Sequence, residues 1–337
     1  MKYKVSCEKT SCRFPVCSKK LDAENLLNGD IGILKAVKLR REMLVDKFLK
    51  YIKYERRLSE HTFTSYQTDL KQFRLFVEEG LEKEFDPKHV TSKDIRAWIV
   101  ELMQNGDKPS SVNRKVSAVK SFYKYLKKER IVESDPTAVV TTPKREKRLP
   151  VFVKESAMDD LLNDVGEYFG DDFEGVRNKT IIETFYSLGI RLSELVGLTD
   201  GNVDFSSMTV KVYGKGGKER IIPFGENLRG AFEIYLKKRE GITPIEGSFF
   251  CRPDGRSLYP VLVWRIVRGA LEKVSTQQKK SPHVLRHTFA TAMLNNGAEI
   301  GAVRELLGHS SLAATEVYTH LTFEQLQKIY QQAHPRA

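Results

Sequence analysis

Apolar residues recur at three- or four-residue intervals from about residue 39 onward, which is the spacing of amphipathic helices. The pattern predicts four helices whose apolar stripes face a common core. Ser59 is suited to cap the second helix and Gly80 to end it, while Thr91 and Asp94 form a capping-box pattern before the third. The stripes comprise Leu44, Phe48 and Ile52, then Tyr66, Leu70, Phe73 and Val77, then Ile95, Trp98 and Leu102, and finally Val112, Val116, Val119, Phe122 and Leu126.

Helix and strand signals alternate in the second half of the chain. Ser281 and Pro282 are typical of a helix start, and Gly308 after two leucines is typical of a helix end. β-branched residues at 208–213 and 219–224 flank a glycine-rich segment, which predicts a β-hairpin. We therefore expect a mainly α protein with a small β-sheet in its second part.

The balance of charge indicates a polyanionic partner. The chain has 337 residues, with 56 Lys and Arg against 44 Asp and Glu, and a formal net charge of +12. Its length suits two domains. Prolines and basic residues mark a break, so we expect a variable, poorly ordered leader at 1–37, a helical domain at 38–140, a basic linker at 141–150 and a second domain at 151–337.

Membrane and metal chemistry have little support in the sequence. No stretch is apolar enough to cross a bilayer and the start lacks the apolar core of a signal peptide, so we expect a cytoplasmic protein without a membrane partner. Cys7, Cys12 and Cys17 have no adjacent histidine, and His283 and His287 have no Glu between them and no obvious third ligand. We expect no metal and no cofactor.

Two side chains at the expected helix start suit an anion. His283 falls in the first turn, where backbone N–H groups and the helix dipole favour negative charge, and Arg286 lies on the same face. An arginine fork can grip two phosphate oxygens and stabilise charge in a transition state. The alternative is an ordinary basic helix with solvated charges.

Cations also occur at two unusual places upstream. Arg191 lies within an apolar run at 184–195, where burial is costly unless the side chain is paired, for instance with Glu194, or binds an anion. Lys215 and Lys218 lie at the expected hairpin tip. Either lysine could protonate a leaving oxygen, or both could be ordinary solvated turn residues.

The last two candidates lie near the end of the chain. His309 follows Gly308 at a corner between helices, a place that can aim a side chain, and Tyr318 lies on the next expected helix. A phenol is a poor nucleophile at its usual pKa of about 10. Tyr318 is therefore a credible nucleophile only beside cations, and otherwise an ordinary core or surface aromatic.

In this order, the candidates resemble the six-residue catalytic set of the tyrosine recombinase (phage integrase) family: Arg191, Lys215, His283, Arg286, His309 and Tyr318. The surrounding phrases match as well, including Gly-Ile-Arg-Leu-Ser-Glu-Leu, Gly-Lys-Gly-Gly-Lys-Glu-Arg and Leu-Leu-Gly-His-Ser-Ser-Leu. From about residue 40 to its end, the chain is most similar to the bacterial Xer-type recombinases. It departs from their pattern at Leu188, where Thr is frequent, and at Ala292-Met293, where His-Leu is common.

The resemblance implies a reaction that cuts and rejoins DNA without metal or ATP. Tyr318 would attack the scissile phosphorus and form a 3′-phosphotyrosyl bond, with the two arginines on the non-bridging oxygens. Lys215 would protonate the leaving 5′ oxygen, His283 would assist proton transfer with Tyr318, and His309 would hydrogen-bond the phosphate. A 5′ hydroxyl from a partner duplex would then attack the phosphotyrosine.

The resemblance also implies a two-domain DNA clamp, with a SAM-like core-binding domain at 38–140 and a catalytic domain at 151–337. Its partner would be a double-stranded recombination site, and a homotetramer, or a heterotetramer with a related recombinase, would hold two duplexes. A C-terminal docking helix would pack into a neighbouring protomer through Phe323, Leu326, Ile329 and Tyr330. The alternative is that this face folds back on its own domain.

Three classes of function remain in play. The leading one is a site-specific recombinase that acts in Xer-like chromosome dimer resolution, in integration or excision of a mobile element, or in DNA inversion. A type IB topoisomerase shares the tyrosine chemistry, but the Xer-like N-terminal domain and C-terminus argue against it. An inactive DNA-binding relative is disfavoured by the intact six-residue set.

Overall fold

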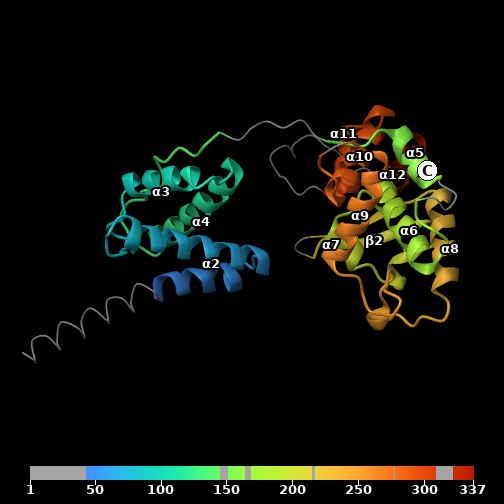
Figure 1. Cartoon of the computed structure of the whole chain (residues 1–337). Helices are drawn as coiled ribbons and strands as arrows, with labels where there is room; N and C mark the ends of the chain where they lie inside the picture. The colour runs from blue at the N-terminus through green and yellow to red at the C-terminus, as the bar shows by residue number, and fades with distance from the viewer. Residues whose placement is uncertain (1–42, 145–150, 164–167, 215–216, 277, 309–321) are drawn as a thin grey trace, which may run out of the picture. The chain divides into compact units, whose positions relative to one another are not determined.

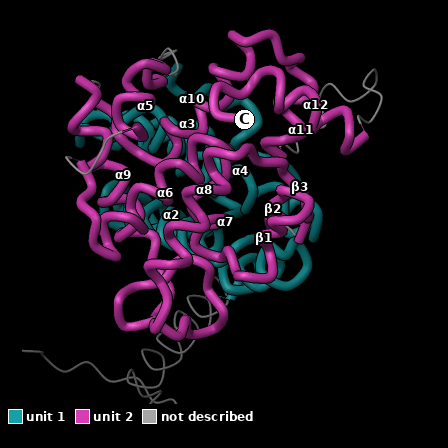
Figure 2. Tube along the Cα trace, turned by 90° about the vertical axis from the view of Figure 1, so that its right-hand side faces the viewer, with its two compact units in different colours: residues 1–147 teal, residues 148–337 magenta. Residues whose placement is uncertain are grey.

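The computed structural model describes residues 43–144, 151–163, 168–214, 217–276, 278–308 and 322–337. The chain divides into unit 1 (residues 1–147) and unit 2 (residues 148–337), which Figure 2 colours separately. Each unit has its own cluster of buried apolar side chains. Both units are mainly helical, and unit 2 contains a three-stranded sheet, so the predicted fold class is confirmed. No helix among the described residues is long and apolar enough to cross a membrane.

The described part of unit 1, residues 43–144, consists of four helical segments, drawn in blue to green in Figure 1. Local capping sets the starts of two of them: the Ser59 hydroxyl accepts a hydrogen bond from the Thr62 N–H, and Thr91 and Asp94 form the predicted capping box. The segments are residues 43–50 with a π-helical turn at Tyr51–Glu55, α2 (Glu60–Leu75) with a second π-helical turn at Phe76–Gly80, α3 (Ser92–Gln104) and α4 (Pro109–Lys128).

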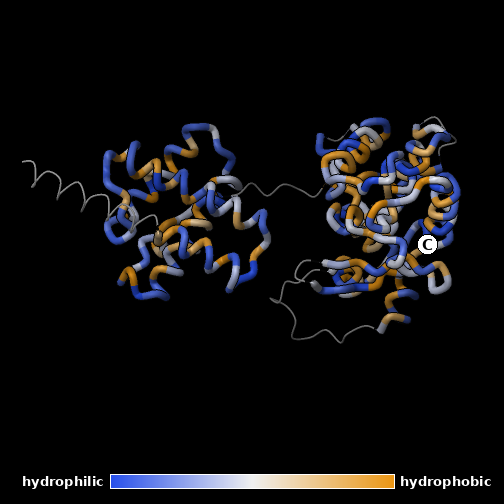
Figure 3. The backbone as a smooth tube through the Cα atoms, turned by 90° about the horizontal axis from the view of Figure 1, so that it is seen from below, coloured by the Kyte–Doolittle hydropathy of each residue, from blue (hydrophilic) through white to orange (hydrophobic). Residues whose placement is uncertain are grey.

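The apolar stripes predicted from the sequence meet in the core of unit 1. Phe73 packs against Trp98 with ring centroids 4.9 Å apart, and Phe48 packs edge-on against Phe122 at 5.4 Å. Hydrophobic and hydrophilic stretches alternate along the helices (Figure 3). The polar face of α4 therefore remains at the surface, where Lys124 is exposed.

Unit 2 is organised around α6, which is buried along most of its length and packs against α8 and α10. Helices α10, α11 and α12 pack together at one end of the unit (Figure 1). The helices in the described part of this unit are α5 (Glu155–Leu162), α6 (Phe173–Leu188), α7 (Leu192–Val196), α8 (Glu226–Arg239), α9 (Pro260–Val274), α10 (Pro282–Asn295), α11 (Ile300–Leu307) and α12 (Phe323–Ala333), with 3-10 turns at Asp200–Asn202 and Ile245–Gly247.

The sheet of unit 2 is antiparallel. Its strands follow the order β1 (Val203–Asp204), β2 (Thr209–Tyr213) and β3 (Glu219–Pro223). β2 and β3 form the predicted hairpin, with Tyr213 opposite Glu219 in the last pair before the tip. Because β3 contacts α11 and α12, the hairpin is anchored on the helices at the C-terminal end of the unit.

The C-terminal helix packs on its own unit within this single chain, and its docking into a neighbouring protomer stays a prediction. Tyr330 is completely buried and Leu326 nearly so, and α12 contacts α10, α11 and β3. A capping box between Thr322 and Gln325 starts this helix. The amphipathic stripe finds its apolar partners within the same chain, as in the alternative that we weighed.

The residues after α12 extend this packing. The His334 ring stacks on the Tyr330 ring with centroids 4.9 Å apart, and its Nε2 lies 3.2 Å from the Tyr186 carbonyl oxygen. Arg336 donates through Nε to Glu183 Oε1 at 2.7 Å. Together with α12, this segment forms a structural part of unit 2.

Candidate active site

A tight turn after α6 presents Arg191. Gly189 ends α6 with φ of +57°, a conformation that favours glycine. A Cβ at this position would lie 2.5 Å from the Phe289 ring and 2.9 Å from the Leu307 side chain, so glycine lets α6 end directly against α10 and α11. Arg191 follows two residues later as the N-cap residue of α7.

Arg191 has two partners and remains partly exposed. Its Nη1 donates to Glu194 Oε1 at 2.7 Å, and its Nη2 donates to the Gly308 carbonyl oxygen at 3.2 Å. The ion pair that we weighed as the alternative for Arg191 therefore exists. It leaves donors free, because a guanidinium has five N–H groups and 39% of this side chain is exposed.

Arg286 on α10 is buried and held by backbone groups. Its Nη1 donates to the Gly189 carbonyl oxygen at 2.7 Å, and its Nη2 donates to the Leu307 carbonyl oxygen at 2.6 Å. Burial and repulsion from Arg191 lower the pKa of Arg286 to about 10, so it stays charged at neutral pH. These partners are neutral, so the positive charge remains available to an anion.

The C-terminal end of α11 collects three arginines. Carbonyl groups at a helix end lack partners within the helix and carry partial negative charge, which favours cations. Here Leu306 accepts from Arg220 Nε at 2.8 Å, Leu307 from Arg286 Nη2 at 2.6 Å and Gly308 from Arg191 Nη2 at 3.2 Å. We call Arg191, Arg220 and Arg286 the arginine cluster.

One buried carboxylate lies within this cluster. Arg220 donates through Nη1 and Nη2 to the two oxygens of Glu194, at 2.9 and 2.8 Å. The backbone N–H of Arg191 also donates to Glu194 Oε2 at 2.8 Å. Burial raises the pKa of Glu194, but the hydrogen bonds from Arg220 and Arg191 outweigh it and lower the pKa to about 2. The carboxylate is ionised at neutral pH, and its single charge pairs with two of the three guanidinium groups.

His283 lies beside the cluster in the first turn of α10. The helix begins at Pro282 as predicted, although the side chain of the N-cap residue Ser281 makes no capping hydrogen bond. The rings of His283 and His287 lie 4.6 Å apart. Burial lowers the pKa of His283, and repulsion from His287 and from the arginines lowers it further. The neutral imidazole is therefore favoured, and it can accept a proton.

The structure brings three of the six sequence candidates together, namely Arg191, His283 and Arg286. The other three, Lys215, His309 and Tyr318, lie outside the described residues. Strands β2 and β3 precede and follow residues 215–216 in sequence, and Lys218 is exposed.

Arg220 is the member of the cluster that the sequence reasoning missed. It shares its face of β3 with buried Ile222 and is itself only 13% exposed. A charged residue at an inward-facing strand position needs a partner, and this signal could have identified it. Its partner Glu194 lies 26 positions earlier, a separation that no local spacing rule covers.

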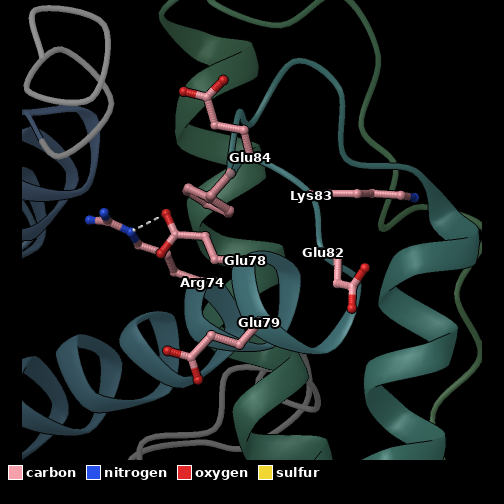
Figure 4. A pocket seen from close by; sticks show the side chains of 7 residues that line it. Arg74, Glu78, Glu79, Glu82, Lys83 and Glu84 are labelled. Atoms are coloured by element: carbon pink, nitrogen blue, oxygen red, sulfur yellow. Dashed lines mark hydrogen bonds and ion pairs between the residues drawn. The ribbon is translucent and has the colours of Figure 1, made fainter. Parts of the chain in front are cut away.

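Unit 1 has a mainly acidic pocket just after α2, in contrast to the basic arginine cluster of unit 2. The lining includes Glu78, Glu79, Glu82 and Glu84, and Arg74 donates to Glu78 at 2.9 Å (Figure 4). Four carboxylates against Arg74 and Lys83 give this lining a net negative charge, which disfavours a phosphate backbone. Among the residues that the structure describes, no group of three His, Cys, Asp or Glu side chains could hold a metal ion.

Comparison with known proteins matches both units to one family. The profile of the phage integrase family matches residues 152–325, and that of the phage integrase N-terminal SAM-like domain matches residues 45–130. The chain is 39% identical over 317 residues to tyrosine recombinase XerC of Chlorobaculum parvum, covering 87% of this chain and 94% of that protein. It is 37% identical over 296 residues to tyrosine recombinase XerD of Halalkalibacterium halodurans, covering 87% and 98%.

Solved structures share the fold. The Tn1549 transposon integrase in complex with circular intermediate DNA has a TM-score of 0.64 at 21% identity, covering 85% of this chain and 98% of that one. The XerH site-specific recombinase bound to difH substrate has a TM-score of 0.61 at 19% identity, covering 84% and 83%. At these identities the likeness concerns the fold.

Proposed function

Because the chain belongs to the phage integrase family, as a tyrosine site-specific recombinase that binds DNA, we propose that the arginine cluster holds the phosphate at which DNA is cut. The end of α11 carries this proposal, since three guanidinium groups gather there and, among the described residues, only one carboxylate, Glu194, pairs with two of them. Positive charge in excess, partly shielded from water, attracts an anion strongly.

Arg191 and Arg286 are the phosphate ligands in this proposal. Arg286 is held by two carbonyl groups, and Arg191 is held by one carbonyl group and by Glu194. These contacts fix both forks, and the cluster keeps a net positive charge because Glu194 is its only carboxylate partner in the described part of the chain. Donors that are already in place stabilise the charge that develops on the non-bridging oxygens of a pentacovalent transition state. Because the cations are preorganised, the reaction needs no metal for this purpose.

We assign the remaining steps to the other candidates. Tyr318 attacks the phosphorus and forms the 3′-phosphotyrosyl bond, while the bond to the 5′ oxygen breaks. Lys215 donates a proton to that oxygen, and Lys218 is the second candidate for this role. His283, whose neutral form is favoured, accepts the phenolic proton of Tyr318. His309 donates a hydrogen bond to the phosphate.

Strand exchange requires the 5′ hydroxyl of one duplex to attack the phosphotyrosine of another. We therefore propose that four protomers hold two duplexes, either as a homotetramer or as a heterotetramer with a related recombinase. Chromosome dimer resolution, integration or excision of a mobile element, and DNA inversion all use this step. Since α12 packs on its own unit in the single chain, docking in trans would require this helix to leave that unit.

A duplex nicked near the cleavage point tests the chemistry, because loss of the short strand traps the covalent intermediate. The parent protein should be trapped, whereas Tyr318→Phe should bind the same duplex without forming an adduct. Equal trapping of Tyr318→Phe would exclude Tyr318 as the nucleophile. A chelator should leave cleavage intact, and strict dependence on a divalent metal would contradict the mechanism.

A supercoiled plasmid with two candidate sites separates the classes of function. Recombined products are expected. Relaxation alone would indicate a topoisomerase, and binding without cleavage would indicate an inactive relative.

A further inference from the structure

Arg220 differs from the other members of the arginine cluster because its donors are turned inward. Its Nη1 and Nη2 bind the two oxygens of Glu194, and its Nε binds the Leu306 carbonyl oxygen. Its side chain is 13% exposed, against 39% for Arg191. All three nitrogens of the guanidinium therefore have a partner within the protein, so Arg220 is poorly placed to bind the phosphate itself.

Arg220 is linked to Arg191 through the Glu194 carboxylate, which accepts hydrogen bonds from both residues. Each oxygen of this carboxylate accepts one hydrogen bond from Arg220 and one from Arg191. A bidentate pair fixes the plane of a carboxylate as well as its position. Without Arg220, Glu194 would keep its bonds to Arg191 but lose the contact that fixes it to the sheet.

Arg220 is also linked to Arg286, through the backbone carbonyl groups at the C-terminal end of α11. The Leu306 carbonyl that Arg220 holds is next to the Leu307 carbonyl that holds Arg286. Packing is close at this point, since a Cβ on Gly308 would lie 3.1 Å from the Arg220 side chain. The helix end that supports Arg286 is therefore attached to β3 by Arg220.

We propose that Arg220 is a positioning residue that fixes Arg191 and Arg286 relative to each other. It joins the carboxylate behind one arginine to the helix end behind the other, and it does not touch the substrate. The inference rests on the proposed function of the cluster as a phosphate site. An error of about 1 Å in such a geometry can cost roughly 100-fold in rate, although binding of the whole duplex depends on many other contacts.

Arg220→Lys and Arg220→Gln test the proposal. Lysine keeps the charge but has no planar fork, and glutamine keeps one amide donor group without the charge. Both variants should bind a single site within about twofold of the parent, while single-turnover cleavage of the nicked duplex should fall by about 10- to 100-fold. Glu194→Gln should show a defect of the same kind, and the double variant should lose less than the sum of the two single defects, because both break the Arg220–Glu194 pair.

A second substrate distinguishes a defect in the arginine cluster from a defect in proton donation by Lys215. A 5′-phosphorothiolate leaving group needs no proton, so it would rescue a variant whose defect lies in Lys215. It should not rescue Arg220→Lys. Full rescue would overturn the proposal by showing that Arg220 acts through the hairpin tip.

Lys211→Ala is the matched control on the same hairpin. Lys211 pairs with Glu219 at 2.6 Å, and both side chains are exposed on the opposite face of the hairpin from Arg220. This variant should cleave at the parent rate, and thermal unfolding should show that all variants are folded. If the parent is trapped on DNA and folded Arg220→Lys cleaves equally fast, only the positioning role is wrong. If the parent protein forms no adduct, both the proposed function and the positioning role of Arg220 are wrong.

Discussion

Arg286 is a buried charge whose contacts leave it available for the phosphate that we propose it binds. It is 5% exposed, yet its partners are the carbonyl oxygens of Gly189 and Leu307. A buried ion pair would have neutralised it, whereas carbonyl groups orient it and leave its charge in place. The two carbonyls come from the ends of α6 and α11, so two helices fix one fork.

Arg286→Lys should remove most of the stabilisation that Arg286 gives to the phosphate in the transition state. A single ammonium group cannot reach both carbonyl oxygens and also present a fork to phosphate. Removal of one preorganised donor typically costs about 100- to 1000-fold in rate, and we expect a loss of that order in single-turnover cleavage with site binding retained. Arg268→Lys on α9 is the control, because Arg268 is exposed and pairs with Glu272 away from the cluster. Cleavage by Arg286→Lys at the parent rate would rule out the proposed role.

At the scale of elements, boundaries set by local residues were predictable and long-range partners were not. The capping box at Thr91 and the helix end at Gly308 depend on neighbours in sequence, and both predictions are confirmed. The carbonyl partners of Arg286 lie 97 and 21 positions away, and no periodicity encodes them. The stripe on α12 was predicted, but the sequence left two partners open, its own unit and a neighbouring protomer, because an apolar face carries no record of which surface covers it.

Deletion of α12 and the residues after it should lower the stability of unit 2, whereas docking in trans implies a defect in assembly alone. Trans docking predicts that a chain without residues 322–337 stays folded and fails only in assembly. Because Tyr330 is fully buried in its own unit, we expect the truncation to open the core and destabilise unit 2. Tyr330→Ala alone should cost about 3–5 kcal/mol in unfolding free energy, measured by urea denaturation. Lys328→Ala, on the exposed face of α12, should be neutral. A stable truncated protein would favour docking in trans.

The His334 segment should make unit 2 sensitive to acid. Burial lowers the pKa of His334 to about 4, from an ordinary value of 6.5. The unfolded chain therefore binds more protons between these values, so the stabilising contribution is complete above pH 6.5 and is lost as the pH falls toward 4. His334→Phe keeps a ring to stack on Tyr330 but cannot ionise. Its unfolding free energy should fall less than that of the parent between about pH 7 and pH 5. Identical pH profiles would contradict this.

The two units of the molecule differ in the features that bear on function. The arginine cluster and the sheet lie in unit 2, whereas unit 1 has a separate core and a basic α4 surface. Separate cores let each unit fold around its own apolar residues, and we propose that both units contact the same DNA. We expect phosphate contacts from both units to add to affinity, while the chemistry depends on unit 2 alone.

The basic segment between the units gives the last prediction. Lys144, Arg145, Lys147 and Arg148 surround a single Glu146, and a segment of this charge should follow the phosphate backbone. Each phosphate contact contributes about 0.9 to the slope of log affinity against log salt. Replacing Arg145, Lys147 and Arg148 with Gln should therefore weaken binding and reduce the slope by up to about 2.7. Sequence preference should persist, because backbone contacts position a protein without reading bases. Glu146→Gln should bind at least as tightly as the parent. An unchanged salt slope in the triple variant would show that the segment does not contact DNA.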